Sequence, residues 1–132
     1  MGSQVADTRF SRAKRLLHAK DYSRVFDSPD ARASHPHFLL LAKINDGPRH
    51  RLGLVIAKKN VRLSVHRNRI KRVARELFRS LPSSEPCLDV ILLARRDMGL
   101  LDNAELSTIL LQQWQKLVRH TTKTIQSTSL ES

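Results

Sequence analysis

Hydrophobic positions along the chain form two patterns, short continuous runs typical of buried strands and a spacing of three and four residues typical of helices. Two short apolar runs, FLLLAKI at 38–44 and RLGLVIA at 51–57, flank the turn-forming residues Asn-Asp-Gly-Pro. Because a turn between two apolar runs favours a hairpin, we expect these runs to form adjacent buried strands. A third run, LDVILLA at 88–94, predicts a further strand.

The segment between the second and third runs has the spacing of an α-helix. Its apolar residues lie three and four positions apart, so they share one face. They are Ile70, Val73, Ala74, Leu77, Phe78 and Leu81. Ser64 is the expected N-cap of this helix, and Pro82 is expected to end it.

Two more helices are predicted, one near each end of the chain. The first covers 16–26 and is followed by Ser-Pro, which does not continue a helix. The last opens at Asp102, where Glu105 three residues later completes a capping box. Trp114 falls on the apolar side of this last helix, so we expect it in the core.

The length of the chain limits its organisation to one domain. A chain of 132 residues can bury a single modest core. We expect that domain over 1–119, with a loose N-terminal arm at 1–10. The polar, Ser/Thr-rich segment 120–132 predicts a disordered tail.

Basic residues change this picture because they are concentrated in one part of the chain. The whole chain has 24 Lys and Arg against 12 Asp and Glu, a net charge of +12. Within 49–79 there are eleven Lys or Arg and one acidic residue. Charge of one sign this dense repels itself unless a polyanion neutralises it, so the segment indicates binding to nucleic acid.

The chain shows no group of residues that would catalyse a reaction by itself. Its six histidines are scattered, and the close pair His35 and His37 has no cysteine or acidic residue beside it. The carboxylates form no cluster of the kind that holds two metal ions. We therefore expect no catalytic residue and no metal site in the protein.

Hydropathy and cysteine content exclude other classes of protein. No apolar run approaches the roughly 18 residues that span a bilayer, and the first residues are polar, unlike a secretion signal. A single cysteine, Cys87, cannot form an internal disulfide and fits a reducing compartment. These features predict a cytoplasmic protein with no membrane partner.

Tyr22 and Phe26 leave two interpretations open. They lie four residues apart and so share a face of the first helix. Exposed aromatic rings stack on unpaired bases, whereas aromatic residues of helices commonly pack in the core. The residues alone favour the core.

One long stretch resembles a known family. The segment RLGLVIAKKNVRLSVHRNRIKRVARELFR at 51–79 resembles the central signature of the bacterial ribonuclease P protein component, in which a strand ending in Lys-Lys leads to a helix opening with Arg-Asn-Arg. The segments 14–29 and 88–106 resemble its flanking parts, so the likeness covers roughly 9–118. It implies an α+β fold, an αβββαβα sandwich similar to the second domain of ribosomal protein S5, with a rare left-handed βαβ crossover.

The resemblance also implies a function and its site residues. The protein would bind a catalytic RNA and the 5′ leader of precursor tRNA, forming an endonuclease whose Mg²⁺ ions are held mainly by the RNA. Contacts to that RNA would come from Arg51, Lys58, Lys59, Arg62, Arg67, Asn68, Arg69, Lys71, Arg72 and Arg75. A leader-binding cleft would contain Tyr22, Phe26 and Phe38, which favours the base-stacking interpretation of the two helical aromatics.

Three other functions compete with this one. A ribosome-associated or general RNA-binding protein with the same fold is the strongest of them. A DNA-binding helix is weaker because no helix-turn-helix pair precedes Ser64. A self-sufficient nuclease is the weakest, since it would need a carboxylate or histidine site.

Overall fold

The structure, a computed structural model, describes residues 19–45, 50–81 and 87–131 of the chain. Four strands form one sheet in the spatial order β1-β2-β4-β3. They are β1 (Ala31–His35), β2 (Phe38–Asn45), β3 (Arg51–Val55) and β4 (Cys87–Ala94). The helices are α2 (Ala19–Asp27), α3 (Ser64–Ser80) and α4 (Asn103–Glu131), with a short 3-10 helix, η3 (Met98–Leu100).

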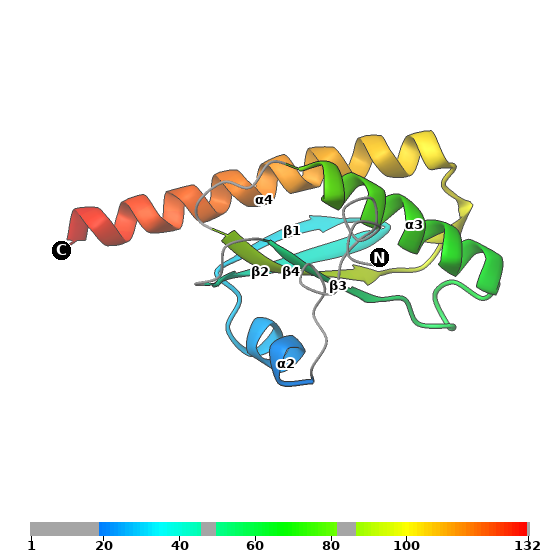
Figure 1. Ribbon diagram of the computed structural model, residues 1–132, viewed down its shortest axis with the longest axis horizontal. Helices are drawn as coiled ribbons and strands as arrows, with labels where there is room; N and C mark the ends of the chain where they lie inside the picture. Colours follow the sequence, from blue (N-terminus) through cyan, green and yellow to red (C-terminus); the bar gives the residue numbers. More distant parts are fainter. Residues whose placement is uncertain (1–18, 46–49, 82–86, 132) are drawn as a thin grey trace, which may run out of the picture.

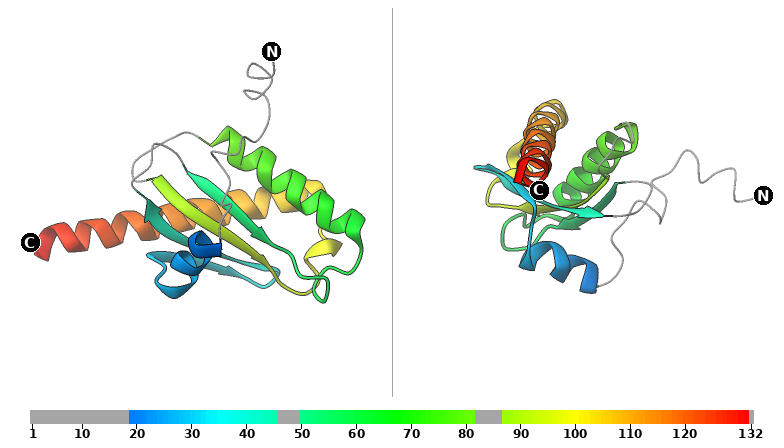
Figure 2. Two further views of the ribbon diagram at one scale, coloured as in Figure 1. Left: turned by 60° about the horizontal axis from the view of Figure 1, so that its bottom comes forward. Right: turned by 90° about the vertical axis from the view of Figure 1, so that its left-hand side faces the viewer.

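The elements are arranged in three layers. Helix α2 lies on one face of the sheet, and α3 and α4 lie side by side on the other (Figures 1 and 2). Leaving η3 aside, the order of elements is the αβββαβα order that the resemblance implies. Helix α3 connects the parallel neighbours β3 and β4, and the left-handed sense of this crossover and the S5-like label stay predictions.

The predicted pairing of 38–44 with 51–57 is wrong. Strand β2 instead forms a hairpin with β1, closed by the two residues Pro36 and His37, and its other neighbour is β4. Seven of the eight residues of β4 are buried, so this strand needs a partner on each edge and a layer on each face. It therefore lies between β2 and β3, which the sequence order alone does not reveal.

The sheet separates two apolar clusters because successive side chains of a strand point to opposite faces. On β2, Phe38, Leu40 and Ala42 belong to the main core beneath α3 and α4, together with Trp114 as predicted. Leu39 and Leu41 belong to a smaller cluster beneath α2, which also contains Val25, Ile91, Tyr22, Val55 and Leu93.

The ends of the helices differ in part from the predictions. The N-cap of α3 is Leu63, whose carbonyl accepts from the amides of His66 and Arg67, so the predicted cap at Ser64 is wrong. The Asp102–Glu105 capping box is confirmed, since each side chain accepts a hydrogen bond from the other residue's amide. The predicted start of the first helix at 16, the arm at 1–10 and the stop at Pro82 lie outside the described residues.

Helix α4 extends to Glu131, through the segment 120–132 for which the sequence predicts a disordered tail. Packing explains why the helix does not end at residue 119. Thr121 is fully buried and donates to the carbonyl of Leu117, and the ring of His120 lies 3.1 Å from the carbonyl oxygen of Arg32 on β1. Contacts with β1 and the burial of Thr121 therefore continue the packing of α4 past residue 119.

Candidate nucleic-acid interface

Helix α3 lays its apolar stripe on the sheet and turns its basic face outward. Ile70, Val73, Ala74 and Phe78 are buried, as the spacing predicts. The opposite face exposes Val65, Asn68, Arg72, Glu76 and Arg79. The helix therefore holds the outer charges on a rigid element, which orients a polyanion better than a loop does.

The loop from β3 to α3 carries further exposed basic residues. Lys58, Lys59 and Arg62 are exposed in this loop. The side-chain amide of Asn60 donates to the carbonyl of Ala94 at 2.9 Å, which ties the loop to the end of β4. Sequence reasoning missed this role of Asn60, because its partner lies 34 residues away. We call the exposed set the basic face: Lys58, Lys59, Arg62, Asn68 and Arg72.

Arg67 and Arg69 are half-buried and hold neighbouring segments in place. Arg67 donates from one guanidinium nitrogen to the carbonyls of Val61 and Arg62, at 3.0 and 2.8 Å. Arg67 therefore uses part of its hydrogen-bonding capacity within the protein, as Arg69 does through the bonds described next. The contact of these two arginines with RNA stays a prediction.

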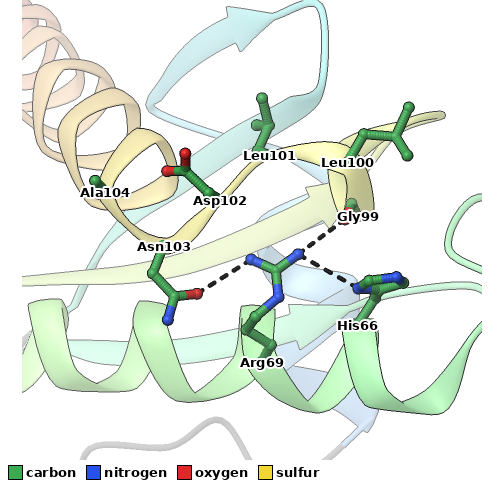
Figure 3. Close-up of a pocket in the computed structure, with 8 residues that line it drawn as sticks. All are labelled: His66, Arg69, Gly99, Leu100, Leu101, Asp102, Asn103 and Ala104. Atoms are coloured by element: carbon green, nitrogen blue, oxygen red, sulfur yellow. Dashed lines mark hydrogen bonds between the residues drawn. The ribbon is translucent and has the colours of Figure 1, made fainter.

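Arg69 connects α3 to the segment that opens α4, as Figure 3 shows. Its guanidinium donates to the carbonyl of Gly99 at 2.8 Å and to the side-chain oxygen of Asn103 at 3.1 Å. The ring of His66 lies 3.4 Å from the same guanidinium. Arg69 thus positions η3 against the first turns of α3.

Arg51 is bound to carboxylates inside the protein. It makes a bidentate pair with Asp89, at 2.8 and 2.7 Å, and lies 3.6 Å from Asp21 of α2. The hydrogen bond that Arg51 donates to Asp89 raises the pKa of Arg51. Asp89 is almost fully buried and also accepts from Asn45 at 2.8 Å. The structure therefore gives Arg51 a role in anchoring α2 to the sheet, and its predicted RNA contact stays a prediction.

On the α2 face, Tyr22 and Phe26 differ in exposure. Phe26 is 41% exposed, whereas Tyr22 is half-buried in the cluster beneath α2. The Tyr22 ring lies so close to Gly53 of β3 that a Cβ atom there would be 2.8 to 2.9 Å from ring atoms. Gly53, to which the sequence alone assigns no role, therefore makes room for Tyr22. Of the two aromatic rings, that of Phe26 is the more exposed.

The prediction that Phe38 lines the same cleft is wrong. Its side chain is 0% exposed and packs in the main core, on the sheet face covered by α3 and α4. The next residue, Leu39, faces α2 and is half-buried. The predicted residue is one position away from the side chain that faces α2, because successive side chains of a strand point to opposite faces of the sheet.

Titratable side chains do not gather into a metal-binding group in the part of the chain that the structure describes. No three His, Cys, Asp or Glu side chains gather there in a way that could hold a metal ion. His50 is buried, and burial lowers its pKa. Its Nδ1 accepts from the amide of Leu88 at 2.9 Å, so its role is structural. Across 19–45, 50–81 and 87–131, no helix is long and apolar enough to cross a bilayer.

Comparison with known proteins identifies relatives over most of the chain. The family model of ribonuclease P matches residues 10–118. The ribonuclease P protein component of Pseudomonas paraeruginosa is 45% identical over 115 residues, which cover 87% of this chain and 85% of that protein. The protein of the same name from Pseudomonas savastanoi is 46% identical over 110 residues, 83% of each chain.

Solved structures show the same fold. The Staphylococcus aureus RNase P protein aligns with a TM-score of 0.71 at 25% identity, over 79% of this chain and 94% of that one. The Thermotoga maritima RNase P protein aligns with a TM-score of 0.62 at 24% identity, over 74% and 92%. The mixed four-stranded sheet with its three helices is therefore shared with these proteins.

Proposed function

Because the chain belongs to the ribonuclease P protein family, we propose that it is the subunit that binds the catalytic RNA of a bacterial ribonuclease P. Membership of this family means a role in 5′ processing of tRNA within a ribonucleoprotein. The proposal adds that the protein acts in the cytoplasm and contacts both the catalytic RNA and the leader of precursor tRNA.

One observation supports the RNA contact most directly. The basic face presents four exposed cations and an exposed amide on α3 and the loop that precedes it. Lysines and arginines arranged in this way neutralise successive phosphates and release their counterions, which provides most of the affinity for RNA. Arg72 in particular can donate two parallel hydrogen bonds to one phosphate.

The leader contact is assigned to the α2 side of the sheet. The open ring of Phe26 can stack on an unpaired base, and the edge of the half-buried Tyr22 lies one helical turn away. This face lies on the opposite side of the sheet from α3 (Figure 2). The protein would thus contact the catalytic RNA and the substrate through different layers.

Catalysis is assigned to the RNA. Mg²⁺ ions in such a reaction polarise the phosphate and activate water, and the described protein residues provide no cluster of ligands that would hold them. The protein's own contribution is therefore to neutralise phosphate charge between two RNA molecules and to orient the leader.

The test is single-turnover cleavage of precursor tRNA by the ribonuclease P RNA of the same organism, with and without this protein. At low Mg²⁺ concentration the protein should raise the cleavage rate, because its cations replace dissolved ions. Tight RNA binding without any gain in cleavage would contradict the proposal and favour a general RNA-binding protein.

A further inference from the structure

Three aliphatic side chains at the start of α3 and in η3 are unusually exposed. Leu63, Val65 and Leu100 are 59%, 64% and 80% exposed, the highest values among the large hydrophobic residues that the structure describes. Leu63 and Val65 lie within the basic segment 49–79 and outside the apolar stripe of α3. Packing within the protein does not account for them, so they indicate a surface that meets a partner.

Leu63 and Leu100 line the same hollow in the surface. This hollow, of about 270 Å³, lies between the start of α3 and η3, and its lining includes Arg62, His66 and Asp97. It adjoins a larger, shallow hollow of about 690 Å³, whose lining residues are drawn in Figure 3. His66, Gly99 and Leu100 line both. The smaller hollow lies just below the range of small-ligand sites, roughly 300–1,000 Å³, and so has room for part of a nucleotide.

The walls of the smaller hollow are held in place by the two half-buried arginines. Arg67 binds the carbonyls of Val61 and Arg62 on one side, and Arg69 binds the carbonyl of Gly99 on the other. A Cβ atom at Gly99 would lie 3.1 Å from Val61 and 3.3 Å from His66, so η3 packs closely on the start of α3. A site whose walls are already ordered loses little entropy when a ligand enters.

The chemistry of the lining favours one class of occupant. Aliphatic side chains contact the flat face of a nucleobase, and the exposed Arg62 at the rim can bind the adjoining phosphate. Asp97 would repel a phosphate inside the hollow but would accept a hydrogen bond from a base amino group. The surrounding +10 charge of segment 49–79 attracts a polyanion.

We propose that this hollow binds one unstacked nucleotide of the RNA partner, with its base against Leu63 and Leu100 and its phosphate on Arg62. This inference rests on the proposed function, and it names a base-binding contact beside the phosphate-binding basic face. Arg67 and Arg69 act as positioning residues for it.

The test uses the double variant Leu63→Ser/Leu100→Ser in the full chain. Both side chains are exposed, and Ser at 63 is a better N-cap than Leu, so the fold should be retained. Leu111→Ser, at a residue 38% exposed on α4, is the matched control. Melting curves confirm folding, and affinity for the ribonuclease P RNA of the same organism is measured across a salt series.

Loss of a base contact should weaken RNA binding about five-fold at fixed salt, which corresponds to the lower end of the energy of one stacked base. The slope of log affinity against log salt should stay unchanged, because no phosphate contact is removed. Chemical probing of the RNA should show a nucleotide whose reactivity changes on binding the wild-type protein and not the double variant. The control should match the wild type in all three measurements.

Unchanged affinity of the folded double variant overturns this inference and leaves the proposed function intact. A reduced salt slope also overturns it, since that would mean a lost phosphate contact. If the free wild-type protein self-associates and the double variant does not, the hollow is an interface between copies. A wild-type protein without salt-dependent RNA binding overturns the proposed function as well.

Discussion

At the scale of single residues, arginines that look alike in the sequence have different surroundings. Arg72 points to solvent from the middle of α3. Arg67 and Arg69 bind carbonyls of adjoining segments, and Arg51 binds the buried carboxylate of Asp89. Loss of Arg51 would leave that carboxylate buried without its cation, which is strongly destabilising. Of these four arginines, only Arg72 can be replaced without removing one of these fold-stabilising interactions.

His50 predicts how stability depends on pH. Burial lowers its pKa below the ordinary 6.5, so as pH falls through 6.5 the unfolded chain takes up a proton that the folded protein does not. The contribution of neutral His50 to the free energy of unfolding is therefore fully present above pH 6.5. It decreases as pH falls from 6.5 toward the pKa of His50 in the folded protein. His35, whose pKa burial also lowers, acts in the same direction.

The measurement is urea denaturation of the wild type and His50→Asn at several pH values from 7.5 to about 5. Asn can still accept from the Leu88 amide but does not titrate, so its stability should decrease less steeply with falling pH. It should also lose about 1–3 kcal/mol at neutral pH, since His50 packs on Phe78 and Trp114. Parallel pH dependences of the two proteins would show that His50 is not responsible.

At the scale of elements, α3 separates a packing face from the exposed face to which we assign RNA binding. Its buried stripe determines which cations point outward, so substitutions on the outer face should change binding and not stability. Helix α2 does the same on the other side of the sheet, with Val25 buried and Phe26 open.

For α3 we expect Arg72→Ala to reduce the salt slope of RNA binding by about one unit, because one phosphate contact is lost. Its melting temperature should stay close to that of the wild type. Arg67→Ala should reduce the salt slope and, unlike Arg72→Ala, also lower the melting temperature, because the carbonyls of Val61 and Arg62 lose their hydrogen-bond donor. Arg119→Ala, an exposed cation of α4, is the control. An unchanged slope for folded Arg72→Ala would remove this residue from the interface.

For α2 we expect Phe26→Ala to weaken binding of precursor tRNA to the reconstituted complex more than binding of mature tRNA. Only the precursor carries a leader, and one stacked base contributes roughly 1–3 kcal/mol. Leu111→Ala is the matched control, because Leu111 is 38% and Phe26 41% exposed. Equal losses for the two RNAs would mean that Phe26 does not contact the leader.

At the scale of the whole molecule, the three layers separate the two proposed RNA contacts. The basic face of α3 and the open ring on α2 lie on opposite sides of one sheet (Figure 2). A protein built in this way can hold a catalytic RNA and a substrate strand at once without contributing reacting groups. This arrangement predicts how dissolved cations should affect variants.

Raised Mg²⁺ should restore much of the cleavage rate that basic-face variants lose, because screening of RNA repulsion can be supplied by dissolved ions. It could not replace a missing general base. The measurement is single-turnover cleavage across a Mg²⁺ series for Lys58→Ala/Arg72→Ala and for Asp, Glu and His variants. A folded, RNA-bound carboxylate or histidine variant that stays inactive at every Mg²⁺ concentration would mean that the protein provides chemistry.

The sequence by itself determined the features that depend on near neighbours. The apolar stripe of α3, the Asp102–Glu105 cap, the core position of Trp114 and the density of charge in 49–79 all follow from spacing along the chain. The family signature in 51–79 is local in the same sense, and the match over 10–118 confirms it.

Only the tertiary structure decided the features that depend on distant contacts. Strand β4 separates β2 from β3 because it is buried on both faces, and no local turn signal reveals that. The register of β2 places Phe38 in the core and Leu39 toward α2. The partners of Arg51 and Arg69 lie 38 and about 30 residues away in sequence. Charge can be counted along a chain, but whether a guanidinium meets a carbonyl or solvent depends on how the layers pack.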